Sequence, residues 1–179
     1  MELHTSRLLL RDFTLIDIDA VHAYQSDPRY LEHSPWPTRS RADVADFVQM
    51  LIEWSLERPR IRYQLAIVHG AALIGSCGIR RSAWDAVEAE FGCELAPAAW
   101  GHGYAAEASR AILAFGFREL RLQRIFAKTT TTNRHAIALA RRLGMREEDS
   151  TYKAESSDNT VAFDIGERHW NDASAPGLQ

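Results

Sequence analysis

The stretch that decides the fold spans residues 94–108 and reads ELAPAAWGHGYAAEA. Apolar and polar residues alternate up to Leu95, as in a β-strand, and Pro97 ends that pattern. A loop with two glycines follows, and from Tyr104 the apolar residues recur at helical spacing. Glycines let a backbone approach a ligand closely, and the N–H groups that begin a helix favour a bound phosphate. The pattern therefore indicates either a phosphate site or a tight strand-to-helix turn without a ligand.

Two common phosphate-binding motifs do not fit this loop. A P-loop requires G-x-x-x-x-G-K-[ST], and no lysine follows these glycines. A dinucleotide-binding fold requires a third glycine and an early first strand, whereas this loop follows the third of the sheet-forming strands. Both classes are therefore excluded.

Outward from this stretch, the chain predicts elements in the order β-α-α-β-β-β-α-β-α-β-β. Alternation and turn residues place strands at 7–11, 63–69, 72–80, 87–95, 124–130, 146–154 and 160–167. Helical spacing places helices at 14–26, 40–57, 104–120 and 133–143, with Ser40 and Asp43 as a capping box and Asn133 as a cap. This order implies an α/β (α+β) domain with a mixed sheet and helices on both faces. We expect one domain at 1–170 and a polar tail at 171–179.

Composition narrows the class of protein. The net charge is −3 and the pI is near 6.2, which argues against a nucleic-acid partner. The two cysteines, Cys77 and Cys93, lie in apolar strands and are expected to be reduced thiols. No metal-binding motif and no apolar run of membrane-spanning length occurs, so we expect no metal, no membrane association and a cytoplasmic location.

Three motifs in order resemble one known family. They are TSRLLLR at 5–11, W-G-x-G-Y-A-x-E-A at 100–108, and Asn133-Arg134 followed by RLGM at 142–145. Over residues 5–168 the chain resembles the GNAT superfamily of N-acetyltransferases, in particular its RimJ/RimL-type branch. The resemblance implies a mostly antiparallel central sheet that is splayed at its central parallel strands.

The resemblance also implies acetyl-CoA as the acyl donor. The loop would hold the pyrophosphate, the backbone of one strand would pair with the pantetheine arm, and a helix cap would contact the coenzyme. The residues so implied are Cys93, Leu95, Ala98, Trp100, Gly101, His102, Gly103, Tyr104, Ala105 and Asn133. The family's loop usually begins with Gln or Arg, whereas this one begins with Ala98. Because backbone N–H groups grip the phosphate, we expect that loss to be tolerated.

The implied reaction is direct attack of a neutral amine on the thioester, with a backbone N–H near Leu95 stabilising the oxyanion. A base must first deprotonate the amine. Glu90 is our first candidate because it matches the Glu of the family's A-E-[IF]-G segment, and Glu94 is the second. A solvated strand face would also explain this run of glutamates. The family's thiolate-protonating Ser is replaced by Ala136, which leaves His135 or Tyr152 as weak alternatives.

The resemblance implies that the acceptor is a primary amine, either a peptide N-terminus or a small molecule. Aromatic side chains could line its pocket, although such residues are more often core: Tyr30, Trp36 and Trp54. A non-catalytic acyl-CoA-binding module with the same fold is the alternative function, favoured by Ala136. A monomer and a homodimer are both compatible with the sequence.

Overall fold

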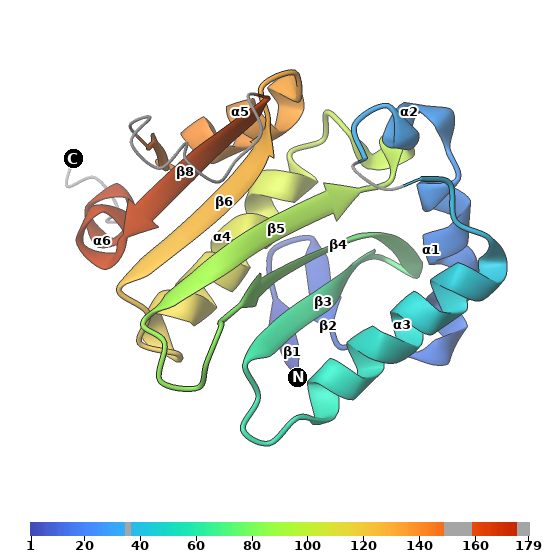
Figure 1. The fold of residues 1–179 in the computed structure, drawn as a ribbon, viewed down its shortest axis with the longest axis horizontal. Helices are drawn as coiled ribbons and strands as arrows, with labels where there is room; N and C mark the ends of the chain where they lie inside the picture. Colours follow the sequence, from blue (N-terminus) through green and yellow to red (C-terminus); the bar gives the residue numbers. More distant parts are fainter. Residues whose placement is uncertain (35–36, 149–158, 175–179) are drawn as a thin grey trace.

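The computed structural model describes residues 1–34, 37–148 and 159–174. Its centre is an eight-stranded sheet in the order β1-β2-β3-β4-β5-β6-β8-β7 (Figure 1). The strands are β1 Glu2–His4, β2 Leu8–Arg11, β3 Arg62–His69, β4 Ala72–Arg80, β5 Glu88–Leu95, β6 Arg124–Thr130, β7 Arg146–Glu147 and β8 Thr160–Gly166. Every neighbouring pair is antiparallel except β5 and β6, which are parallel. The predicted mixed, mostly antiparallel sheet is confirmed.

Helices cover both faces of this sheet. On one face, α1 (Ile18–Gln25) and α3 (Arg41–Leu56) bury an apolar cluster that includes Val21, Val48 and Leu51. On the other, α4 (Tyr104–Arg118), α5 (Arg134–Arg142) and α6 (Glu167–Ser174) enclose the larger cluster around Ile112 and Phe117. Figure 1 shows α4 behind the sheet, with α1 and α3 on the opposite side. The core therefore has two layers, separated by the sheet.

Three elements were not predicted from the sequence: β1, α6 and the short helix α2 (Pro28–Leu31). A capping signal for α2 was present, because Asp27 accepts a hydrogen bond from the Arg29 N–H and Pro28 occupies the first helical position. Helix α6 continues to Ser174, so the boundary expected at residue 170 falls inside a helix. Of the strand expected at 146–154, residues 146–147 form β7 and most of the rest lies outside the described residues.

Two predicted caps are confirmed. The Asp43 N–H donates to Ser40 Oγ at 3.2 Å, and Asp43 Oδ2 accepts from the Ser40 N–H at 2.8 Å, which closes the capping box of α3. Asn133 Oδ1 accepts from the Ala136 N–H at 3.0 Å and so begins α5. Within the described part of the chain, no helix is long and apolar enough to cross a bilayer.

The parallel strands β5 and β6 separate part-way along their length. Their pairing covers Glu88–Arg124, Ala89–Ile125 and Glu90–Phe126 and then stops. Both strands continue, β5 to Leu95 and β6 to Thr130, while β5 stays paired with β4 as far as Leu95. The sheet therefore opens between these two strand ends, as the splayed arrangement expected from the sequence requires.

Candidate functional site

The glycine loop joins the open end of β5 to α4. A short 3-10 turn, η2 (Pro97–Ala99), leads to Gly101 and Gly103, both at φ 79°. Gly103 is the N-cap of α4, and it supplies no side chain to cap that helix. The first N–H groups of α4, those of Tyr104 to Ala106, have no carbonyl partner within the helix. The predicted loop geometry is therefore present, with backbone donors available for an anion.

Side chains of the loop brace it from within. Trp100 Nε1 donates to the Leu95 carbonyl at 2.9 Å, and His102 Nδ1 lies 2.7 Å from the Trp100 carbonyl oxygen. The His102 ring stacks on the Tyr104 ring with centroids 5.6 Å apart. The Arg7 guanidinium lies 4.6 Å from the centroid of the same Tyr104 ring. Three of the predicted coenzyme residues, Trp100, His102 and Tyr104, thus have a supporting role in the loop. Ala98 is exposed and Ala105 is half-buried.

Glu107 ties the loop to the N-terminal TSR motif. Its carboxylate accepts from Thr5 Oγ1 at 2.6 Å, from Ser6 Oγ at 3.0 Å and from the Arg7 N–H at 2.9 Å, and it forms an ion pair with Arg7 Nη2 at 2.6 Å. Arg7 Nη1 also donates to the His102 carbonyl at 3.1 Å. Burial alone would raise the pKa of Glu107, but these hydrogen bonds outweigh it and lower the pKa to about 2. The TSR motif and the motif that contains Glu107 lie about a hundred residues apart in the sequence, and they form one structural unit in the fold.

We expect Glu107→Gln to lower the free energy of unfolding by about 1–3 kcal/mol at pH 7. Because the folded-state pKa is about 2 against an ordinary 4.5, the stabilising charge is fully present above pH 4.5 and is lost as the pH falls to 2. The difference in the free energy of unfolding between wild type and Glu107→Gln, measured in urea, should therefore shrink as the pH falls over that interval. An equal difference at pH 7 and pH 3 would contradict this account.

The backbone of β5 presents unpaired groups to the opening. Ala96 N–H donates to the Ile74 carbonyl at 2.8 Å, so even-numbered residues of β5 direct their backbone groups towards β4. Cys93 and Leu95 therefore direct theirs towards β6, where the ladder has already ended. The Leu95 carbonyl accepts from Trp100, while the N–H of Leu95 faces the gap. These are the backbone groups that the sequence resemblance had implied for the pantetheine arm.

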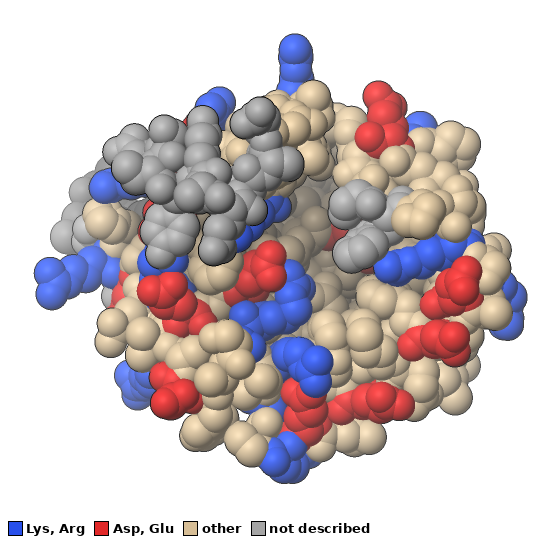
Figure 2. All heavy atoms as spheres, viewed as in Figure 1, with Lys and Arg blue, Asp and Glu red and all other residues tan. Residues whose placement is uncertain are grey.

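Glu94 lies beside this opening, on the α1 face of the sheet. Four side chains donate to its carboxylate: Tyr24 at 2.6 Å, Gln25 at 3.3 Å, Ser76 at 3.1 Å, and Tyr30. These donors come from α1, α2 and β4. Figure 2 shows this face of the molecule, with a hollow near its upper centre. The fold thus gathers Glu94 and Tyr30, both predicted, with Tyr24, Gln25 and Ser76, which were not.

Both tyrosines remain hydrogen-bond donors. Burial, followed by the nearby charge of Glu94, raises the pKa of Tyr24 and of Tyr30 above the ordinary value of 10. The two rings pack edge to face with centroids 5.5 Å apart. Tyr24 falls within the helix predicted at 14–26 and was not among the site residues expected from the sequence. A buried hydroxyl requires a hydrogen-bond partner. A tyrosine within a predicted apolar helix face was therefore the sequence signal for this contact.

The other predicted residues lie elsewhere. Glu90 is in the paired part of β5, about 13 Å along the strand from Glu94, and lies 3.7 Å from Arg80 Nη2. Trp54 is on α3, where the Arg62 guanidinium covers its ring at 4.4 Å. Trp36 and Tyr152 lie outside the described residues. The structure therefore brings Glu94 and Tyr30 together and leaves Glu90 and Trp54 apart from them.

An aromatic cluster spans the opening between the loop and α5. His135 lies 5.6 Å from Trp100 and 5.8 Å from His33, measured between ring centroids. The Asn133 side chain, at the start of α5, caps that helix through its Oδ1. No group of three His, Cys, Asp or Glu residues suited to a metal ion occurs among the residues that the structure describes.

Comparison with known proteins gives consistent matches. A family model described as "Acetyltransferase (GNAT) domain" matches residues 7–146. The uncharacterized N-acetyltransferase p20 of Bacillus licheniformis is 34% identical over 149 residues, which cover 82% of this chain and 83% of that protein. The crystal structure of a GNAT-family acetyltransferase from Bacillus anthracis superposes with a TM-score of 0.78 at 25% identity, covering 94% of this chain and 99% of that one. RimL, a ribosomal L7/L12 α-N-protein acetyltransferase solved with coenzyme A, superposes at 0.79 with 18% identity, covering 93% and 98%.

Proposed function

Since the chain belongs to the GNAT family of acetyltransferases and is an N-acetyltransferase, we propose that it transfers an acetyl group from acetyl-CoA to a primary amine in a ternary complex. The observation that carries this proposal is the opening between β5 and β6 beside the uncapped start of α4. A strand edge and a helix N-terminus at one opening suit a long ligand with a phosphate at its bend. The peptide-like arm of such a ligand matches the backbone groups of Cys93 and the N–H of Leu95, which face the opening.

The residues present fit coenzyme A. Gly101 and Gly103 hold positive φ angles, and a side chain at Gly103 would be strained in that conformation and lie against Arg7. The N–H groups of residues 104–106 would bind the pyrophosphate. The N–H of Leu95 would donate to the carbonyl oxygen of the acyl group, where negative charge develops. When bound, acetyl-CoA supplies the activated acyl group.

We assign the proton-accepting role to Glu94 and place Glu90 second, which reverses the order expected from the sequence. Glu94 lies beside the opening and is held in one orientation by its four donors. A carboxylate in this place attracts an ammonium group and can take its proton directly or through water. Glu90, with a side chain 44% exposed and next to Arg80, lacks such a setting.

The acceptor is proposed as a peptide N-terminus or a small amine, in keeping with a RimJ/RimL-type branch. Tyr30 lies at the wall of the acceptor site, because its hydroxyl donates to Glu94. Trp36, in the adjoining segment, stays a sequence-based prediction, as do the cytoplasmic location and the oligomeric state.

Isothermal titration with acetyl-CoA and a thiol-release assay on amines and N-terminal peptides test the proposal together. We expect micromolar binding, and thiol release with at least one acceptor class. Gly103→Val should weaken acetyl-CoA binding at least tenfold, because a β-branched residue disfavours positive φ and changes the direction of the loop N–H groups. The matched control is Gly70→Val, at φ 59° in the β3–β4 turn.

The possible outcomes separate the candidate functions. Loss of binding in Gly103→Val but not in Gly70→Val supports the loop as the coenzyme site. Binding without thiol release on any acceptor supports the non-catalytic module, which Ala136 favours. Absence of acetyl-CoA binding to the wild-type protein would overturn the proposal.

A further inference from the structure

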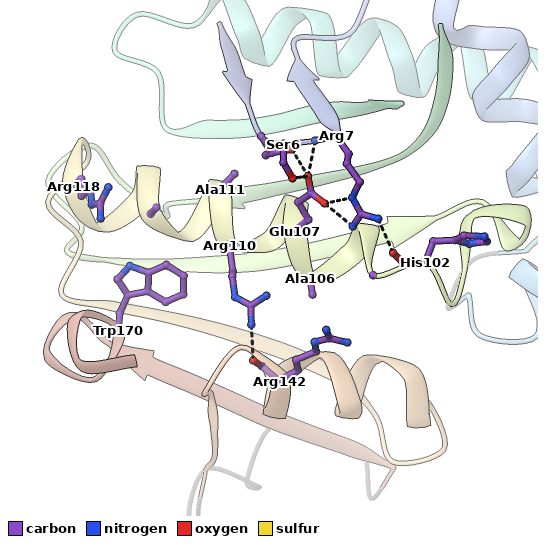
Figure 3. A pocket seen from close by; sticks show the side chains of 13 residues that line it. Ser6, Arg7, His102, Ala106, Glu107, Arg110, Ala111, Arg118, Arg142 and Trp170 are labelled. Atoms are coloured by element: carbon purple, nitrogen blue, oxygen red, sulfur yellow. Dashed lines mark hydrogen bonds and ion pairs between the residues drawn. The ribbon is translucent and has the colours of Figure 1, made fainter. Parts of the chain in front are cut away.

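The two faces of the sheet beside the opening differ in what lies against them. On one face α4 runs along the sheet, and the contact between Glu107 and Arg7 ties its start to the segment before β2 (Figure 3). On the other face α1 contacts β4 and α3 contacts β3. Figure 1 shows no helix of the described residues in front of β5 and β6 on this second face. The face that carries Glu94 is therefore open along β5.

A chain of hydrogen bonds on this face begins at Arg80 and ends at Glu94. Arg80 Nη1 donates to Gln64 Oε1 at 2.7 Å, and Gln64 Nε2 donates to Ser76 Oγ at 3.0 Å. Ser76 Oγ in turn donates to Glu94 Oε1 at 3.1 Å. Because the oxygen of Gln64 accepts from the guanidinium, its NH₂ group faces Ser76, whose hydroxyl donates onward. The chain therefore fixes a guanidinium and a carboxylate relative to one another.

The Arg80 guanidinium lies over Gly92, two residues along β5 from Glu94. A Cβ on Gly92 would lie 3.1 Å from Arg80 Nη2 and 3.5 Å from Arg80 Nη1, so the guanidinium fills the space that a side chain would take. Gly92 pairs with Gly78 of β4, and this part of the face therefore has a floor without side chains. Two residues span about 7 Å of a strand, which is the separation of the guanidinium from Glu94 along β5.

Arg80 keeps hydrogen-bond donors for a ligand. Its acidic neighbour is Glu90, whose carboxylate lies 3.7 Å from Arg80 Nη2 and whose side chain is 44% exposed. An ion pair of this length and exposure contributes little. Arg80 Nη2 forms no hydrogen bond with any residue that the structure describes. Figure 2 shows basic side chains at the lower edge of the hollow on this face. The site thus has a positive group, partly open to solvent, beside the negative Glu94.

We propose that Arg80 binds a carboxylate of the acceptor, and that the acceptor is an amine with this carboxylate about 7 Å from its nitrogen. This inference rests on the proposed function and names its substrate class. With the amine at Glu94 and the carboxylate at Arg80, the acceptor lies along β5 over the paired Gly78 and Gly92. A guanidinium binds a carboxylate through charge-assisted hydrogen bonds. A peptide with an acidic second residue carries the two groups at this spacing, and so does an unbranched ω-amino acid.

Matched acceptors that differ only in this charge test the assignment on the full chain. One pair consists of C-terminally amidated peptides that begin Ser-Asp or Ser-Asn, and the other of ε-aminocaproate and its amide. Thiol release gives kcat/KM for each. In a pair that the enzyme acetylates, the anionic member should have a kcat/KM about 10–100-fold higher, the range expected for charge-assisted hydrogen bonds. Arg80→Gln should bring this ratio close to one. Arg80→Lys should keep part of it, because lysine retains the charge but not the planar fork.

Arg62→Gln is the matched control for the loss of a basic side chain on this face. Arg62 lies opposite Arg80 on the neighbouring strand β3. Its guanidinium is paired with Glu57 and lies against the Trp54 ring, so it points to α3 and not to the Glu94 site. Arg62→Gln should leave the acceptor ratio unchanged. Titration with acetyl-CoA checks that each variant is folded.

The outcomes for the inference and for the proposed function are distinct. A wild-type ratio of one, or an unchanged ratio in Arg80→Gln, would overturn the inference and leave the proposed function intact. Thiol release only with amines that lack an anionic group would do the same. Absence of thiol release from the wild-type protein with every acceptor would instead overturn the proposed transfer reaction itself.

Discussion

Glu94→Gln is expected to lower kcat about 10²–10⁴-fold with the acceptor that supports thiol release, while acetyl-CoA binding stays unchanged. Glutamine keeps the shape of the side chain and one oxygen, which accepts from one of the two tyrosines, because Tyr24 and Tyr30 donate to different oxygens of Glu94. It carries no negative charge to attract the amine and does not accept its proton. Stopped-flow or steady-state thiol release, together with titration of acetyl-CoA, separates the lost chemical step from any lost binding.

Glu90→Gln is the control for this prediction, since Glu90 lies on the same face of the same strand but in its paired part. It should retain kcat within about tenfold of wild type. Thermal unfolding of both variants checks that the Glu94 network is not simply disrupted. If Glu90→Gln lost activity and Glu94→Gln kept it, the assignment would return to the order expected from the sequence.

Gly75→Ala is expected to lower the free energy of unfolding by about 2–4 kcal/mol. A Cβ at this position would lie 2.2 Å from the Glu94 carbonyl oxygen and 2.8 Å from Leu95 Cα, and the residue is at φ 156°. Strand β5 would have to move away from β4 at the two residues that border the opening. Urea unfolding should show the lost stability, and the proposed site should lose affinity for acetyl-CoA at the same time.

Gly70→Ala separates the cost of the contact from the cost of the backbone conformation. Gly70 is also at positive φ, 59°, but a Cβ there meets nothing within 4 Å. Gly70→Ala should lower the free energy of unfolding by only about 1–2 kcal/mol. Equal losses in Gly70→Ala and Gly75→Ala would show that β4 and β5 accommodate the extra methyl group.

The local features of this protein follow from the sequence because their causes are local. Strand alternation predicted β3, β4 and β5, and the glycine loop before a helical stripe predicted the start of α4. The capping box of α3 and the Asn133 cap of α5 were likewise encoded within four residues. The family resemblance added the splayed sheet, which the early end of the β5–β6 ladder supports.

The tertiary structure alone decided which polar groups meet. Glu90 and Glu94 have the same residue type and the same strand face, so alternation could not rank them. Only the positions of α1 and α2 in the folded chain bring Tyr24 and Tyr30 to Glu94, and the β4–β5 register brings Ser76 to it. In the same way, contact between Glu107 and the TSR motif spans about a hundred residues of sequence.

The sequence by itself thus determined most of the secondary structure, the glycine loop and the family, because hydrophobic period, caps and glycine conformations act over a few residues. The tertiary structure decided which of the two carboxylates gathers tyrosine donors and which side chains brace the loop. These depend on side chains from different elements lying within a few ångströms, and such distances arise only when the sheet and helices pack around one core.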